Sequence, residues 1–255
     1  AVKEVFKFMN IEEGMEVHHD GDLPARTGLG SSSAFTVGLI HSLYALKGEM
    51  VTKGQLAKDA IYVEQELIKE NVGSQDQVAT AYGGFNRISF LHDHSIDVRP
   101  LIMSSERQNK LQNNLMLCFT GFSRCASDIA KEQLKRTQEK KKELSKMHQM
   151  VDEAISILNS DSTNIEEFGK LLHESWKLKR SLTDKISNSK VDEIYDTAYS
   201  SGASGGKLLG AGGGGFMIIF ARPEIQQKIR KKLKDLLIVP FQFETMGSQI
   251  IVYQP

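Results

Sequence analysis

The stretch Ser201–Phe216, SGASGGKLLGAGGGGF, contains eight of the 21 glycines in this chain. It runs directly into the apolar segment Phe216–Phe220, which has the length of a buried strand. Glycine allows positive φ and close approach of backbone N–H groups, at an entropic cost that the fold must offset elsewhere. A second loop of this kind, Leu23–Ser33 (LPARTGLGSSS), lies near the start of the chain. Two such loops in one globular chain indicate phosphate binding.

Composition limits the partners of this chain. Its 255 residues are enough for one large domain or for two of ordinary size, and 40% apolar with 25% charged residues is typical of a soluble globular protein. The 32 basic and 32 acidic side chains cancel, so there is no general attraction for nucleic acid or for an anionic membrane. Any anion site must therefore be local.

The cysteines and the apolar runs indicate in which cellular compartment we expect the chain. Cys118 and Cys125 are too few for a disulfide framework, and their spacing fits no common zinc pattern. We interpret them as reduced thiols and expect a cytoplasmic location. No apolar run approaches the ~20 residues that a membrane span needs. The start, Ala1–Met9, predicts an amphipathic helix rather than a signal peptide, and it lacks an initiator methionine.

Apolar periodicity predicts strands that alternate with helices. We expect helices over residues 2–9, 33–47, 52–71, 127–159 (long or broken once), 165–182, 191–201 and 223–237. We expect strands over 15–20, 85–91, 115–120, 216–220 and 249–253, with a hairpin turn at Asp93–Ser95. The fold class is therefore α/β or α+β, and the polar stretch Met103–Asn114 is the candidate boundary between two domains.

The first glycine loop has the features of an anion site. Pro24 stiffens its entry, Gly28 and Gly30 allow a tight turn, and Ser31 or Ser32 then caps a helix whose free N–H groups point into the loop. The alternative is an ordinary tight turn with a serine N-cap. The loop is neither a Walker A sequence nor the dinucleotide fingerprint, because it lacks the closing Gly-Lys-Ser/Thr and the third glycine.

Two carboxylates follow this loop. Glu64 falls within the apolar stripe of the helix that begins at the capping box Thr52–Gln55, where a carboxylate is costly unless it is paired or binds a cation such as Mg²⁺. The alternative is a side chain at the edge of the stripe that reaches water. Asp76, in the turn after that helix, is either a plain turn or cap residue or a base that accepts a proton from an attacking hydroxyl.

Other polar residues carry less information. Arg124 follows a predicted buried strand, where ligands of α/β proteins often bind, and is a candidate anion clamp. Lys207, inside the second glycine loop, is a similar candidate. The pairs His18–His19 and His92–His94 have no third ligand nearby, so we interpret them as loop or surface residues.

The two loops together resemble the GHMP small-molecule kinases. The family's second motif is Pro, three residues, then Gly-Leu-Gly-Ser-Ser, which here is Pro24–Ser32. Its third motif, a Lys-Leu-x-Gly-Ala-Gly-Gly-Gly-Gly run, is Lys207–Gly215. Within the family the chain is similar to the D-glycero-D-manno-heptose 7-phosphate kinases over almost its whole length. Segments such as Gly73–Gln77, Thr120–Arg124 and His173–Trp176 carry that closer likeness.

The resemblance implies a reaction and a fold. The reaction is transfer of phosphate from ATP to the anomeric hydroxyl of a small-molecule sugar phosphate, the heptose 7-phosphate. The fold is a two-domain α+β fold, with a left-handed βαβ crossover in an N-terminal domain, 1–107, and a ferredoxin-like α/β sandwich in a C-terminal domain, 108–255. The sequence leaves the oligomeric state open, with a homodimer as the candidate.

The resemblance also assigns roles to residues. Both loops contribute to ATP binding: Pro24, Thr27, Gly28, Leu29, Gly30, Ser31, Ser32, Ser33, Gly212, Gly213 and Gly214. Ser32 and Glu64 would hold Mg²⁺, and Asp76 would be the base or orienting carboxylate. The substrate would contact Arg124, Lys207 and Gly213, while the glycines of the second loop would also buttress the first.

The chain departs from the family pattern at two points. The first motif, which helps bind the sugar near the N-terminus, is absent, so we expect a truncated chain that lacks early strands of the first domain. Whether such a chain works alone is left open. Arg26 stands where many members have a small residue, and it either adds a phosphate contact or is solvated. Two alternatives remain: a galactokinase-like or mevalonate-kinase-like substrate, and a non-catalytic nucleotide-binding sensor.

Overall fold

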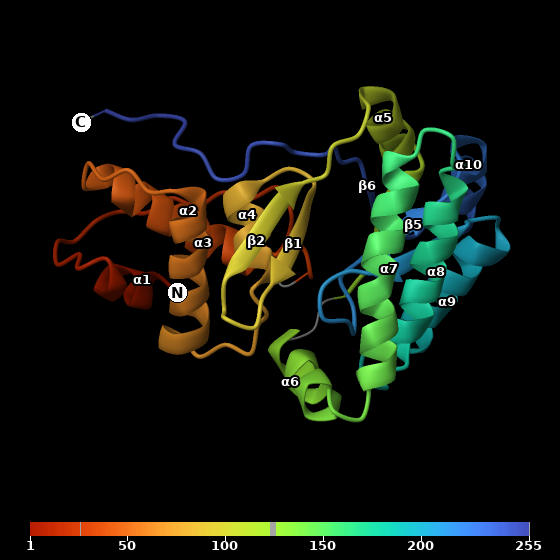
Figure 1. Ribbon diagram of the computed structural model, residues 1–255, viewed down its shortest axis with the longest axis horizontal. Helices are drawn as coiled ribbons and strands as arrows, with labels where there is room; N and C mark the ends of the chain where they lie inside the picture. The colour runs from red at the N-terminus through yellow and green to blue at the C-terminus, as the bar shows by residue number, and fades with distance from the viewer. Residues whose placement is uncertain (26, 123–125, 255) are drawn as a thin grey trace. The chain divides into compact units, whose positions relative to one another are not determined.

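The computed structural model describes residues 1–25, 27–122 and 126–254 (Figure 1). The chain divides into two compact units. The first consists of Ala1–Arg26, Gly30–Pro100 and Phe243–Pro255, and the second of Thr27–Leu29 and Leu101–Gln242. The first glycine loop therefore supplies residues to both units. The expected domain limits, 107 and 108, stay a prediction.

The first unit consists mainly of helices around a shared apolar core. They are α1 (Val2–Phe8), α2 (Ser31–Leu46), α3 (Lys53–Tyr62) and α4 (Gln75–Tyr82), and α3 continues into a π-helical turn, η1 (Val63–Leu67). Their apolar faces meet in the core: Val5, Val37, Ile40, Leu43, Leu56, Ala60, Val63, Val78 and Ala81. The predicted helix start with Thr52 as N-cap is confirmed, because Gln55 N donates to the Thr52 hydroxyl at 3.1 Å. The reciprocal half of the capping box is not found among the described residues, where the Gln55 amide donates to Asp59 instead.

The strands described in the first unit form one hairpin. They are β1 (Asn86–Phe90) and β2 (Ile96–Pro100), which pair antiparallel. The hairpin turn predicted at Asp93–Ser95 is confirmed, because Leu91 N donates to Ser95 O at 3.0 Å. The strands predicted over 15–20 and 249–253 are wrong, since neither segment has a place in a described sheet. Among the described residues, neither segment has a ladder partner that would hold an extended backbone.

The last part of the chain passes along the first unit without helix or strand. Gly84 N donates to Glu244 O at 3.1 Å. Gly83 and Gly247 approach so closely that a Cβ on Gly83 would collide with the backbone of Gly247. These contacts fix the C-terminal end of α4, the helix that carries Asp76 in its first turn.

The second unit is built on a four-stranded antiparallel sheet in the order β4-β5-β3-β6. The strands are β3 (Leu115–Phe119), β4 (Gly205–Leu208), β5 (Phe216–Phe220) and β6 (Ile238–Val239). β3 and β5 confirm two predicted strands. The sequence did not indicate β4, which begins with two glycines, or β6, which is only two residues long.

Six helices are described in the second unit, and five of them lie in the connections between its strands. They are α5 (Ser105–Asn113), α6 (Ala126–Arg136), α7 (Lys141–Asn159), α8 (Glu166–Arg180), α9 (Ser189–Ser200) and α10 (Pro223–Lys232). The helix predicted over 127–159 is thus broken once, between α6 and α7. The strand order, with helices between β3 and β4 and between β5 and β6, is that of a ferredoxin-like sandwich.

The observed architecture is α+β, as expected. The left-handed βαβ crossover expected of the first domain is not found among the described residues of the first unit, whose strands form only the antiparallel hairpin. In the second unit the fully buried Trp176 of α8 belongs to the same apolar cluster as Met217 and Ile219 of β5 and Ile229 of α10. This cluster joins the helices to the sheet.

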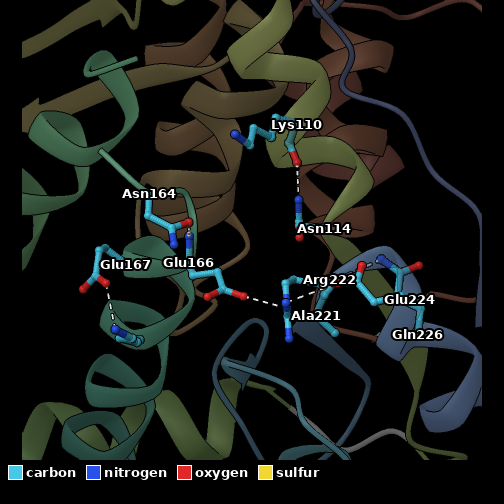
Figure 2. Close-up of polar contacts among 10 residues, drawn as sticks. Lys110, Asn114, Asn164, Glu166, Glu167, Ala221, Arg222, Glu224 and Gln226 are labelled. Atoms are coloured by element: carbon cyan, nitrogen blue, oxygen red, sulfur yellow. Dashed lines mark hydrogen bonds and ion pairs between the residues drawn. The ribbon is translucent and has the colours of Figure 1, made fainter. Parts of the chain in front are cut away.

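A polar network connects α8 to the segment before α10 (Figure 2). The Arg222 guanidinium lies 2.8 Å from a Glu166 carboxylate oxygen and 3.3 Å from one of Glu224. The Gln226 amide donates to Ala221 O at 3.0 Å. Glu166 and Glu224 stand in the first turns of α8 and α10, where a negative charge is favourable. The network therefore stabilises two helix starts at once, although each exposed ion pair contributes little by itself.

Candidate active site

The start of α2 is an uncapped helix end. Gly30 is its N-cap and takes φ 75°, a left-handed conformation that glycine adopts without strain. No side chain caps the helix, so the expectation that Ser31 or Ser32 is the cap is wrong. Gly30 takes the cap position and both serines fall inside the helix. The first turn also holds no acidic residue. Among the described residues, the N–H donors in the first turn of this 16-residue helix thus have no side-chain cap, which suits an anion.

The Asp76 carboxylate lies directly against this helix start. A Cβ built on Gly30 would be 3.3 Å from Asp76 Cγ and 3.4 Å from its Oδ2. Burial raises the pKa of Asp76, and a hydrogen bond with the Gln75 side chain opposes that shift in part. A half-buried carboxylate whose pKa is raised toward neutrality is a competent general base. The structure thus brings Asp76 to the end of the first glycine loop.

Glu64 is almost completely buried, with 1% of its surface exposed. It lies in the π-helical turn η1, a conformation that is frequent at functional sites. Its Oε2 accepts a hydrogen bond from the Ser33 hydroxyl at 2.9 Å and another from the Gln77 amide. Burial is the main cause that raises its pKa. The alternative of a carboxylate at the edge of the stripe that reaches water is therefore wrong.

One oxygen of Glu64 remains available to a cation. Among the described residues, the buried Glu64 Oε1 has no hydrogen-bond partner, and the same is true of Gln77 Oε1. Oxygen donors of this kind fit Mg²⁺. The serine that touches Glu64 is Ser33, whereas Ser32 is exposed. Within the described ranges no group of three or more His, Cys, Asp or Glu side chains could hold a metal, so further ligands would come from hydroxyls, water or phosphate.

Residues Thr27–Leu29 pack against the second glycine loop. Phe216 N donates to Thr27 O at 3.1 Å, and Thr27 is buried. A Cβ on Gly215 would collide with Thr27 O, and a Cβ on Gly210 would lie 2.6 Å from Gly28 Cα. Both positions therefore need glycine, because the two loops meet backbone to backbone.

Two glycine N–H groups of the second loop donate to carbonyls within the protein. Gly213 N donates to Ile186 O and Gly215 N donates to Phe122 O, each at 2.8 Å. A Cβ on Gly212 would lie 2.9 Å from Ile186 Cα, and one on Gly214 would lie 2.7 Å from the Phe122 ring. These contacts hold the second loop to Ile186 and Phe122, and the role of Gly212–Gly214 as a buttress of the first loop stays a prediction.

Two lysines lie beside the second loop. Lys207 is on β4, and burial lowers its pKa. Lys179, on α8, donates to Leu208 O at 3.0 Å and to Gly210 O at 2.5 Å. Burial, followed by the charge of Lys207, lowers the pKa of Lys179 to about 7. Sequence reasoning missed Lys179. The available signal was its spacing of three residues from the buried Trp176 and Leu182, which places it on the core side of α8.

For the other residues that the sequence singled out, the structure gives the exposure of those it describes. Pro24 is exposed, Leu29 and Ser31 are half-buried, and the paired histidines at 18–19 and 92–94 are partly or fully exposed. Arg124, Arg26 and Cys125 lie outside the described residues. Cys118 is a buried free thiol. Over the described part of the chain, no helix combines the length and the apolar character of a bilayer-spanning segment.

Comparisons with known proteins match both parts of the chain. Residues 1–84 match the family model described as "GHMP kinases N terminal domain", and residues 153–238 match "GHMP kinases C terminal". A D-glycero-alpha-D-manno-heptose 7-phosphate kinase of Campylobacter jejuni is 33% identical over 86% of this chain and 64% of its own length. The chain thus spans less than two thirds of that relative.

Solved structures of similar fold include kinases with different substrates. A mevalonate kinase from Methanococcus jannaschii superposes with a TM-score of 0.71 at 25% identity, over 96% of this chain and 73% of that one. A D-glycero-D-manno-heptose 1-phosphate kinase from Bacteroides thetaiotaomicron superposes with a TM-score of 0.69 at 23% identity, over 99% of this chain and 74% of that one. At such identities the second comparison shows the fold alone.

Proposed function

We propose that this chain, which belongs to the GHMP kinase family, uses ATP to phosphorylate a hydroxyl of a small-molecule sugar phosphate. The observation that supports this most strongly is the Asp76 carboxylate beside Gly30, at the uncapped start of α2. A phosphate bound to the free N–H donors of that helix would have a general base next to it. Phosphoryl transfer needs little more than such positioning and charge neutralisation.

Each step follows from the chemistry of these side chains. The backbone N–H groups at the start of α2 hold the phosphates of ATP and stabilise their charge. Asp76 accepts the proton of the sugar hydroxyl as the hydroxyl oxygen attacks the γ-phosphorus, and ADP leaves. Glu64 is the proposed carboxylate ligand of Mg²⁺, with Ser32 as the second ligand and Ser33 holding Glu64 in place. The ion would supply charge neutralisation between the β- and γ-phosphates.

The remaining assignments are supported by neighbouring residues. Pro24 and Thr27–Leu29 shape the first loop, and Gly212–Gly214 hold the second loop, whose Gly210 and Gly215 touch Gly28 and Thr27 of the first. Lys207, Gly213 and Arg124 are the proposed substrate contacts, with Lys207 the half-buried cation on β4. We also propose a cytoplasmic location, and a homodimer as the assembly to test.

The proposed acceptor is the anomeric hydroxyl of D-glycero-D-manno-heptose 7-phosphate, because the Campylobacter relative carries that name. A mevalonate-type acceptor is the second candidate, since several archaeal mevalonate kinases are 25–30% identical to this chain. A non-catalytic nucleotide-binding sensor is the third. It is less favoured, because Asp76 and Glu64 both stand in positions that chemistry would use.

A substrate panel tests these assignments. The chain is incubated with ATP and Mg²⁺ and with heptose 7-phosphate, heptose, galactose or mevalonate in turn, and ADP release is followed. The proposal predicts the fastest release with heptose 7-phosphate and a new anomeric phosphate signal in ³¹P NMR. Turnover with mevalonate alone would establish the second candidate. Nucleotide binding without turnover of any acceptor would establish the sensor.

A further inference from the structure

Lys179 differs from the other cations at the end of α8. Lys177 is exposed and pairs with Glu174 at 3.1 Å, and Arg180 pairs with Asp192 at 3.1 Å. Lys179 is only 9% exposed and has no carboxylate partner among the described residues. A buried ammonium without a counter-ion is unfavourable, so its position needs a specific reason.

The contacts of Lys179 lie on a single turn of backbone. Its Nζ donates to Leu208 O, at the end of β4, and to Gly210 O, two residues further on. Gly210 takes φ 61°, so the chain reverses there. Each of these carbonyls would lose a donor if the amine were absent, and for the buried Leu208 an unsatisfied carbonyl is unfavourable. One side chain therefore fixes both ends of the turn Leu208–Gly210.

This turn is the surface on which the first glycine loop rests. A Cβ on Gly28 would lie 3.0 Å from Leu209 O, and one on Gly210 would lie 2.6 Å from Gly28 Cα. Gly28 itself takes φ 81°. No space remains between the two backbones, so a shift of the turn would displace Gly28. The residues next to Gly28 are the proposed phosphate-binding residues.

We propose that Lys179 is a positioning residue: it fixes the turn Leu208–Gly210 and thereby holds Gly28 and the phosphate-binding loop in the conformation that accepts ATP. The nucleotide part of this inference rests on the proposed function, whereas the structural part does not. The buried position of Lys179 supports the inference, because burial and the nearby Lys207 lower its pKa to about 7 and no nearby carboxylate offsets that cost. A lysine that served only surface solubility would point to water, as Lys177 does.

The test compares Lys179→Met with the matched control Lys177→Met on the same helix. Hydrogen exchange of the full chain without nucleotide is measured for the peptide that covers 205–216. Loss of two hydrogen bonds should raise exchange of this peptide about tenfold in Lys179→Met and weaken ATP affinity by about the same factor. We expect kcat at saturating ATP to change less than threefold, and Lys177→Met to behave as wild type.

A second variant separates positioning from packing. Lys179→Ala leaves a space in which a small primary amine such as n-butylamine can place an ammonium group. The amine should restore exchange protection and ATP affinity in Lys179→Ala, and it should not affect Lys177→Met. If Lys179→Met does not fold, Lys179→Ala with the amine is measured in its place.

Three results would overturn the inference about Lys179. Wild-type exchange and ATP affinity in Lys179→Met would overturn the inference, as would a uniform rise in exchange over the whole second unit. Failure of the amine to restore protection would also overturn it. If the wild-type chain binds no nucleotide, the proposed function fails, while the exchange measurement still decides whether Lys179 holds the turn.

Discussion

The two glycine-rich loops look alike in sequence but use their backbone differently. In the second loop, Gly213 N and Gly215 N donate to carbonyls of the protein, and Gly212 and Gly214 allow other parts of the chain to come close. In the first loop, the chain passes from Gly30 into α2 without any side-chain cap. Two donors of the second loop are satisfied within the protein, whereas the helix start after the first loop has no side-chain cap among the described residues.

This difference teaches that glycine content alone does not identify a phosphate site. Glycine serves close packing in one case and an open helix start in the other. What separates the two loops is the acceptor that each N–H group meets. The presence of Asp76 beside Gly30 adds a chemical group to the first loop only.

The largest effect is expected at Asp76, because the comparison assigns the chemistry to the first loop. Asp76→Asn should lower kcat by ~10²–10⁴, the range usual for loss of a general base, while ATP binding is kept. The control is Asp93→Asn, which makes the same chemical change in the hairpin turn. Steady-state ADP release and nucleotide titration on the same preparations check the prediction. Unchanged turnover in Asp76→Asn would remove this residue from the mechanism.

The next effect concerns the packing role of the second loop. Gly215→Ala puts a Cβ into Thr27 O at a residue with φ 99°, so the free energy of unfolding should fall by about 3 kcal/mol or more. Gly38→Ala, in the open middle of α2 with nothing within 4 Å of the new Cβ, should raise it by about 0.5–1 kcal/mol. Chemical denaturation measures both variants. Equal effects would show that the second loop is not held by close packing.

Substitutions of Ser32 and Ser33 distinguish a metal-binding role from a structural role. Ser33→Ala removes a buried hydrogen bond to Glu64 and should cost about 1 kcal/mol. Ser32→Ala should leave stability unchanged and raise the Mg²⁺ concentration that half-maximal activity requires. Thermal unfolding and a Mg²⁺ titration of both variants give the answer. If Ser33→Ala alone changes the Mg²⁺ requirement, the assignment of Ser32 is wrong.

The smallest predicted effect concerns the free energy of unfolding, because burial of the Asp76 carboxylate is unfavourable. Burial raises the pKa of Asp76 above its ordinary 3.8, so the folded chain binds more protons than the unfolded chain between that value and the raised pKa. Stability therefore falls as pH rises through this window. At pH 7 Asp76→Asn should therefore raise Tm, and the gain should vanish below about pH 4, the ordinary pKa of an aspartate. A gain that persists in acid would contradict the assigned cause.

The sequence predicted those parts of the fold that depend on local pattern. The helix start at Thr52, the hairpin turn at Asp93–Ser95 and the strands β3 and β5 follow from short-range periodicity and turn chemistry. The two loops were recognisable because several glycines are clustered in each of them. Glu64 could be singled out because a carboxylate in an apolar stripe is costly, and its burial agrees with that reasoning.

The remaining features depend on tertiary contacts. Lys179 looks like an ordinary cation at a helix end until the carbonyls of Leu208 and Gly210 are placed around it. Gly30 replaces the expected serine cap because of the backbone angle that the loop imposes. The tail predicted as a strand at 249–253 has no partner to pair with, and strand pairing cannot be deduced from one segment alone.

The most direct measurement is hydrogen exchange of both loops with and without ATP and Mg²⁺. We predict that the Gly213 and Gly215 amides are already protected without nucleotide and change little. The amides at the start of α2, Ser31–Ser33, should exchange freely without nucleotide and become protected when ATP binds. Protection gained in the second loop while the first stays unchanged would contradict the account.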